Sequence, residues 1–259
     1  MGELHTTMAA LRAVGSFIEE SGVDDAWIES GLYGPATVRQ MLECKHYKRT
    51  LSAHMVTLQA LGSLYQNAFL KDCPDKKVTE TLTELRLPGQ EDEDEMKQFH
   101  KKLTEFMDAN RHYYEDFNER NCNRPMFAIY LEYMEMILSI LRFIQATRQG
   151  NWQMHLQSLE NLTKYFFALD RVKYARMAPL YLAEMIALEH SDPAIWNEFS
   201  SGNFVVNKNS VPSCAIGPDH AIEHENRWMK VRGGIVGITT KDSPRSPISD
   251  CPRAVPTLK

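Results

Sequence analysis

The sequence predicts a mainly α-helical protein: an irregular multi-helix bundle with a small strand–loop–helix appendix and a disordered C-terminal tail. Apolar residues recur at helical spacing through the first 200 residues. One short β-branched segment, residues 203–207, has the composition of a strand. The last nineteen residues hold four prolines and no apolar periodicity, and such a segment buries too little surface to offset the entropy of ordering.

The first half of the chain predicts five helices separated by glycine, proline and charged segments. Gly22 follows the first apolar repeat, Pro35 suits the first position of the third helix, and Pro74 ends the fourth. The acidic residues 91–95 precede the fifth helix, where carboxylates oppose the positive end of the helix dipole. We interpret them as a solvated loop rather than a metal or partner site. The predicted helices cover residues 4 to about 22, 24–28, 35–44, 46–71 and 95–121.

The second half is richer in core residues. Residues 124–148 are apolar on nearly every side, which predicts a central helix that is the most buried element. Pro179 has no backbone donor, so we expect it to kink or restart the helix that contains it. Asp192 and Pro193 can cap one more short helix. The predicted helices cover residues 124–148, 151–168, 171–190 and 193–199.

The appendix follows Gly202. Residues 203–207 form its strand, and residues 235–239 could pair with that strand. Asp219 begins a helix that two glycines stop after Arg232. We therefore expect a helical domain, an appendix packed on it and a disordered tail, over residues 1–200, 201–240 and 241–259.

Charge and cysteine content exclude several classes of protein. The 259 residues carry 29 Lys and Arg against 34 Asp and Glu, a net charge of −5, so no domain-wide basic field is present to bind phosphates. Five scattered cysteines without C-x-x-C spacing predict reduced thiols in an intracellular protein, nuclear or cytoplasmic. Glu132, Glu135 and Arg142 interrupt the most apolar segment, so we expect no membrane association. We expect no cofactor.

One motif has the spacing of a metal site. His220, Glu223 and His224 form H-x-x-E-H, in which two histidines lie one helical turn apart beside a possible general base. A catalytic zinc takes three protein ligands, and no well-placed third ligand follows His224. The alternative is a surface helix on which Glu223 pairs with Arg227. We therefore assign no metal site, with His220 and His224 as the candidate ligands and Glu223 as the candidate catalytic residue.

A basic stripe lies close in sequence to several aromatic residues. It comprises Lys164, Arg171, Lys173 and Arg176. A stripe of this kind can bind nucleic acid or an acidic protein, although acidic residues interrupt it. We treat it as a candidate binding surface for an unspecified partner.

Six stretches carry a resemblance to a known group of proteins. They are residues 2–9, 150–156, 166–176, 179–182, 202–206 and 219–226. Their order and spacing resemble uncharacterised, repeat-encoded proteins of animal genomes that look transposon-derived. The resemblance implies that the chain corresponds to the helical C-terminal part of a transposase-like protein, cut at both ends. If the parent has ribonuclease-H-type chemistry, acidic residues would hold two metal ions, and Glu223 would be the last of them.

Together these observations predict a transposon-derived fragment without catalytic activity. The alternative is a helical module that binds protein or nucleic acid, the latter through the function of the parent element. The third hypothesis is a metal-dependent hydrolase that uses His220, Glu223 and His224.

Overall fold

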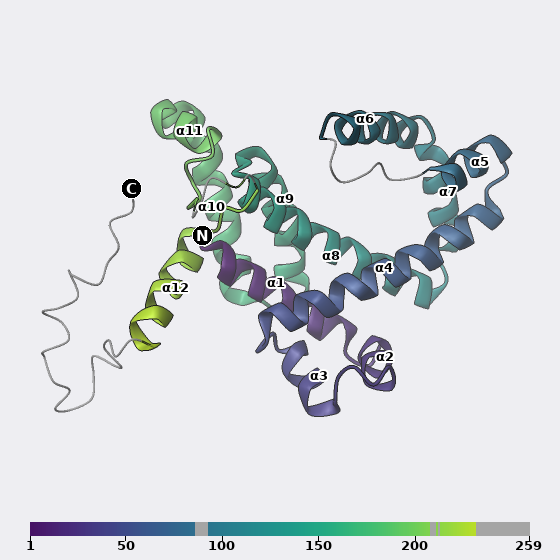
Figure 1. The fold of residues 1–259 in the computed structure, drawn as a ribbon, viewed down its shortest axis with the longest axis horizontal. Helices are drawn as coiled ribbons and strands as arrows, with labels where there is room; N and C mark the ends of the chain where they lie inside the picture. The colour runs from purple at the N-terminus through teal and green to yellow at the C-terminus, as the bar shows by residue number, and fades with distance from the viewer. Residues whose placement is uncertain (86–92, 208–210, 212, 232–259) are drawn as a thin grey trace, which may run out of the picture. The chain divides into compact units, whose positions relative to one another are not determined.

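The computed structural model describes residues 1–85, 93–207, 211 and 213–231 (Figure 1). Within these residues the regular structure is helical, apart from one isolated β-bridge. None of the described helices combines the length and the apolarity needed to cross a bilayer. The helices are α1 (Glu3–Ile18), α2 (Val23–Glu29), α3 (Pro35–Leu42), α4 (Tyr47–Asp72), α5 (Lys76–Glu84), α6 (Glu93–Ala109), α7 (Arg111–Asn121), α8 (Pro125–Gln149), α9 (Trp152–Ala168), α10 (Val172–Ser191), α11 (Pro193–Ser200) and α12 (Pro218–Val231).

Two compact units make up the chain. The first comprises Met1–Ala13 and Ser139–Lys259, and the second comprises Val14–Leu138. The boundaries between the units fall inside α1 and α8. The boundary predicted at residue 200 lies inside the first unit.

The first unit is built around α9, which packs on α10 and α11. Its aromatic cluster centres on the buried side chains of Trp152, Leu156 and Phe204. Gly150 and Gly202 have positive φ angles of 64° and 90°, and a Cβ on Gly150 would lie 3.2 Å from the Gly202 Cα atom. The turns after α8 and α11 therefore meet backbone to backbone, which brings Phe204 onto Trp152 with 5.0 Å between ring centroids.

The predicted strand 203–207 is replaced by a single antiparallel bridge. Val206 and Ile216 exchange two backbone hydrogen bonds of 2.8 and 3.0 Å. The backbone preceding Val206 turns to bury Phe204, so the segment is not extended over its whole length. The expected partner, residues 235–239, lies outside the described residues, as does the predicted tail 241–259.

The second unit has its own buried cluster, formed by Phe69, Val78 and Phe117. Phe69 stacks on Tyr114 with 4.1 Å between ring centroids, so α4 and α7 are joined by aromatic contact. His54 lies elsewhere in the unit, fully buried, with its Nδ1 atom 2.9 Å from the Tyr133 hydroxyl.

Two helix predictions in this unit need correction. The predicted helix 95–121 is two helices, because the backbone leaves the α-helical conformation at Asn110, where φ is −109° and ψ is 10°, and α7 begins after it. Helix α5 was not predicted. Its sequence signal is Asp75, whose side chain accepts a hydrogen bond from the Lys77 amide at 2.9 Å and caps the helix.

The burial of the helices also differs from the prediction. Eight of the 25 residues of α8 are buried, compared with ten of 16 in α1 and eight of 17 in α9. α8 is therefore not the most buried element, because charged and partly exposed residues occupy one side of it, whereas small residues of α1 fit against their neighbours. α10 runs through Pro179 as one helix, so of the kink or restart that we expected, the restart does not occur; Pro179 itself is exposed.

Candidate functional site

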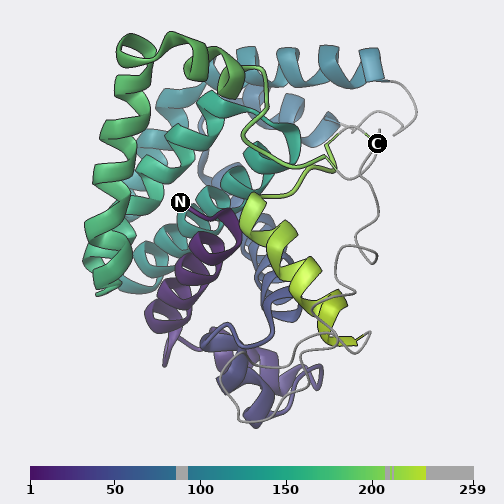
Figure 2. The ribbon, with the colours of Figure 1, turned by 90° about the vertical axis from the view of Figure 1, so that its left-hand side faces the viewer.

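The N-terminal ends of α1 and α12 meet in the first unit, although they lie at opposite ends of the sequence (Figure 2). The Asp219 carboxylate of α12 accepts hydrogen bonds from the backbone amides of Leu4 (3.3 Å) and His5 (3.1 Å). Those amides belong to the first turn of α1, where backbone donors have no partner within the helix. Asp219 therefore caps α1 from more than 200 residues away.

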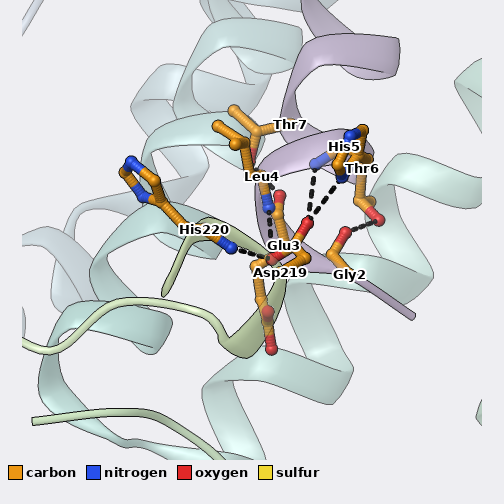
Figure 3. Close-up of polar contacts among 8 residues, drawn as sticks. All are labelled: Gly2, Glu3, Leu4, His5, Thr6, Thr7, Asp219 and His220. Atoms are coloured by element: carbon orange, nitrogen blue, oxygen red, sulfur yellow. Dashed lines mark hydrogen bonds and ion pairs between the residues drawn. The ribbon is translucent and has the colours of Figure 1, made fainter. Parts of the chain in front are cut away.

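A side-chain contact reinforces this cap (Figure 3). His5 Nδ1 lies 2.9 Å from Asp219 Oδ2, and the His220 amide donates to Asp219 Oδ1 at 2.9 Å. Burial acts to raise the pKa of Asp219, but the hydrogen bonds from His5, Leu4 and His220 outweigh burial and lower it. Asp219 is therefore held as a carboxylate.

Glu3 places a second carboxyl beside Asp219. Its side chain is buried, with 7% of the residue exposed. No described group donates a hydrogen bond to Glu3 Oε2. Burial, followed by the nearby Asp219, raises the pKa of Glu3 to about 7. A protonated Glu3 can donate to Asp219, so the pair shares one proton below neutral pH and loses it as the pH rises through about 7.

Two glycines make room for this carboxyl pair. A Cβ atom on Gly2 would overlap Asp219 Oδ2, and a Cβ atom on Gly217 would overlap Glu3 Oε2. A side chain at either position would force the Asp219 or Glu3 carboxyl group out of this arrangement. We refer to Glu3, His5 and Asp219, with these two glycines, as the carboxyl latch.

The pKa values of the two carboxyls are displaced in opposite directions, as in sites that use one acid and one base. The Asp219 oxygens, however, are already occupied by the amides and the imidazole described above. The residues that the structure describes also contain no group of three or more His, Cys, Asp or Glu that could hold a metal ion. The geometry therefore favours a structural role with a titratable proton.

Comparison with known proteins places the chain in a family. A family profile described as a domain of unknown function, DUF8702, matches residues 1–247. The chain belongs to the DUF8702 family. No curated protein and no solved structure shows significant similarity to it.

The H-x-x-E-H residues of this DUF8702 protein lie on α12, immediately after the latch. The rings of His220 and His224 approach edge to face, with 4.7 Å between centroids, and Glu223 is exposed. The His220 ring points away from the Asp219 carboxylate (Figure 3). The structure thus brings the two predicted zinc ligands together but adds no third one to them within the described residues.

The predicted basic stripe is divided by the structure. Lys164 lies over the Tyr165 ring at 4.6 Å from its centroid, and Arg171 Nη2 donates to the Arg12 carbonyl at 3.1 Å. Lys173 and Arg176 are exposed on α10. Arg171 therefore stabilises the fold through this hydrogen bond. Of the stripe, Lys173 and Arg176 are the residues best placed to bind a partner.

Sequence reasoning missed the environment of His155 in the DUF8702 protein. His155 is 1% exposed, and both of its ring nitrogens lack hydrogen-bond partners. It stacks on Trp152 with an interplanar angle of 10° and also contacts Phe143 and Phe204. Burial lowers its pKa to about 3. No sequence signal distinguishes it from the exposed histidines, apart from its place on the apolar side of α9.

Sequence reasoning also missed an exposed apolar surface on α10. Leu180 and Met177 are 53% and 48% exposed, and Val172 and Ile186 are each 56% exposed. On one side of the helix, Met177 and Leu180 alternate with charged and small residues, whereas Val172 and Ile186 project in other directions. We call this side the α10 face: Lys173, Arg176, Met177, Leu180, Ala183, Glu184 and Ala187, all exposed.

Proposed function

We propose that this DUF8702 protein is a non-catalytic helical interaction module that binds another protein molecule through the α10 face. The observation that carries the proposal is the exposure of Met177 and Leu180 at the middle of a regular helix. Large apolar side chains gathered on one exposed surface and edged by polar residues are typical of protein interaction sites. The α10 face has that pattern.

The neighbouring elements support the same surface. Ala175 and Ala178 are buried on the side of α10 that packs on α9. This packing holds the helix in place and leaves its opposite side, the α10 face, exposed to solvent. A helix held on one side and apolar on the other is the surface against which a second helix can pack.

Protein fits this surface better than nucleic acid does. Binding to nucleic acid depends on several cations that neutralise phosphates. The α10 face offers Lys173 and Arg176 but also Glu184, and its centre is apolar. The chain as a whole carries a net charge of −5. Charge and apolarity together therefore favour a protein partner.

Site-specific photo-crosslinking in cells tests the proposal. A photoreactive residue at Met177 should give adducts with one predominant protein, which mass spectrometry identifies. The adducts should disappear when Leu180→Asp is added, because a charge at the centre of the contact cannot be buried without a partner. Met126, which is also about half exposed but lies on α8, is the matched control position. Adducts of equal yield from Met126, or adducts with nucleic acid alone, would contradict the proposal.

We also propose that the chain descends from a repeat-encoded mobile element. The support is the six stretches within residues 2–240 that resemble such proteins. Counting genomic copies tests this origin. Many dispersed near-copies are expected, whereas a single intact locus would argue for a gene without a mobile origin.

A further inference from the structure

The α10 face has a charge arrangement that identifies one particular partner. We propose that it binds a second copy of this chain, with the two α10 helices antiparallel and the two Leu180 side chains in contact at the two-fold axis. This inference rests on the proposed function, because it names the partner that the same surface takes.

The spacing of the α10 face makes a contact along the helix possible. Lys173, Leu180 and Ala187 are seven residues apart, and such residues project in nearly the same direction from an α-helix. Met177 and Glu184 lie on one flank of this line, and Arg176 and Ala183 lie on the other. The face therefore has an apolar centre at Leu180 and charged residues toward both ends.

An antiparallel two-fold brings opposite charges together. With Leu180 on the axis, Lys173 lies level with Ala187 of the second copy, one turn from Glu184 of that copy and on the same flank. The long Lys173 side chain can reach that carboxylate. Because the interface is symmetric, each contact occurs twice, which gives two Lys173–Glu184 pairs per dimer.

The small residues of the face suit the same arrangement. Ala183 and Ala187 lie opposite Arg176 of the second copy, on its flank. Small side chains there leave room for the aliphatic part of Arg176 to lie across the helix while its guanidinium reaches water. Neither flank then buries an unpaired charge.

A parallel arrangement would have the opposite result. It would place Lys173, Arg176 and Glu184 each at the same level as the identical residue of the second copy, and no opposite charge would lie level with any of them, so the like charges would repel. The charge order along α10 therefore selects the antiparallel orientation.

The charges needed for these pairs are available in the single chain. Lys173 and Glu184 are exposed and form no ion pair with any described residue. They lie three turns apart on α10, too far for a pair within one helix. In the antiparallel dimer, each Lys173 and each Glu184 therefore gains an ion pair with the other copy.

Sedimentation velocity on the purified full chain over a range of concentrations tests the proposal. We expect a reversible, concentration-dependent dimer, weak because one helix pair buries less than a standard interface. Leu180→Asp should abolish it. Leu64→Asp, a matched substitution at an exposed position of α4, should leave it unchanged. A chain that stays monomeric, or a dimer insensitive to Leu180→Asp, would overturn the proposal.

Charge reversal tests the orientation. Lys173→Glu and Glu184→Lys should each weaken the homodimer about tenfold, since both replace two attractive pairs with repulsive ones. An equal mixture of the two variants should form a heterodimer about as strong as the wild-type dimer, because every pair is then attractive again. A mixture that associates no better than its separate components would overturn the antiparallel pairing.

The two proposals fail in different ways. A monomer in sedimentation together with Leu180-dependent cellular adducts to another protein would overturn self-association and leave the proposed function standing. A monomer without any Leu180-dependent adduct would overturn both.

Discussion

Glu3 is a carboxylic acid kept away from water beside the carboxylate of Asp219. Its pKa of about 7, against about 4.5 for a free glutamate, means that the folded state binds a proton more tightly than the unfolded state does. Stability from this group is therefore greatest below pH 4.5 and falls as the pH rises toward 7 and above.

Replacing Glu3 with Gln should remove this pH dependence. The amide retains a donor for Asp219 and never ionises, so we expect the variant to be more stable than wild type at pH 8, by up to about 3 kcal/mol. Thermal unfolding from pH 5 to pH 8 measures the difference. Glu160→Gln, at an exposed position of α9, is the matched control. If the stability of wild type and of Glu3→Gln changes with pH in the same way, Glu3 does not bind a proton more tightly in the folded state.

His155 is a second residue whose burial has a pH consequence. Its folded pKa of about 3 lies below the ordinary value of 6.5, so its stabilising effect is present above pH 6.5 and is lost as the pH falls toward 3. His155→Phe should flatten this acid-induced loss. At pH 7 it should leave stability unchanged or raise it, by up to about 1 kcal/mol, because the imidazole has no polar partner to lose.

His54 provides the contrast for this measurement. It is equally buried, but its ring accepts or donates a hydrogen bond at the Tyr133 hydroxyl. His54→Phe should therefore cost about 1–3 kcal/mol at pH 7, because it removes this buried hydrogen bond and leaves the hydroxyl only the Thr57 side chain as a partner. Chemical denaturation measures the free energy of unfolding of both variants. Equal changes in His54→Phe and His155→Phe would show that the hydrogen bond to Tyr133 does not stabilise the protein.

At the scale of the helix, Asp219 determines how α1 begins. Asp219→Ala leaves the amides of Leu4 and His5 without acceptors and should cost about 1–2 kcal/mol. Hydrogen exchange at these two amides should accelerate before that of the remainder of α1. Asp219→Asn retains one acceptor oxygen and should show a smaller loss. Unchanged exchange in Asp219→Ala would show that water caps this helix equally well.

Helix α12 also permits a direct test of the hydrolase hypothesis. Two histidines one turn apart supply only two ligands, so we expect well below one bound zinc per chain after dialysis against metal near the protein concentration. Elemental analysis measures this ratio. One zinc per chain, lost in both His220→Ala and His224→Ala, would make the metal-dependent hydrolase the leading hypothesis.

At the scale of the whole molecule, the sequence predicts that residues 241–259 contribute nothing to the core. They lack apolar periodicity and contain four prolines. Deleting them should leave the melting temperature unchanged within error. A fall of several degrees in calorimetry would show that this segment belongs to the packed structure.

The sequence by itself determined most of the helices. Residues 46–71, 124–148 and 151–168 were predicted within one residue of α4, α8 and α9, because apolar periodicity is a property of a few neighbouring residues. The same reasoning joined α6 to α7, since no glycine or proline marks the change of backbone conformation at Asn110.

Only the tertiary structure decided the candidate sites. Asp219 was predicted to begin its own helix, yet its carboxylate caps α1, and burial at this contact raises the pKa of Glu3 to about 7. The α10 sequence is apolar on several sides, and packing on α9 decides which of them faces solvent. Burial and pKa depend on which distant segments meet, and local periodicity holds no information about that.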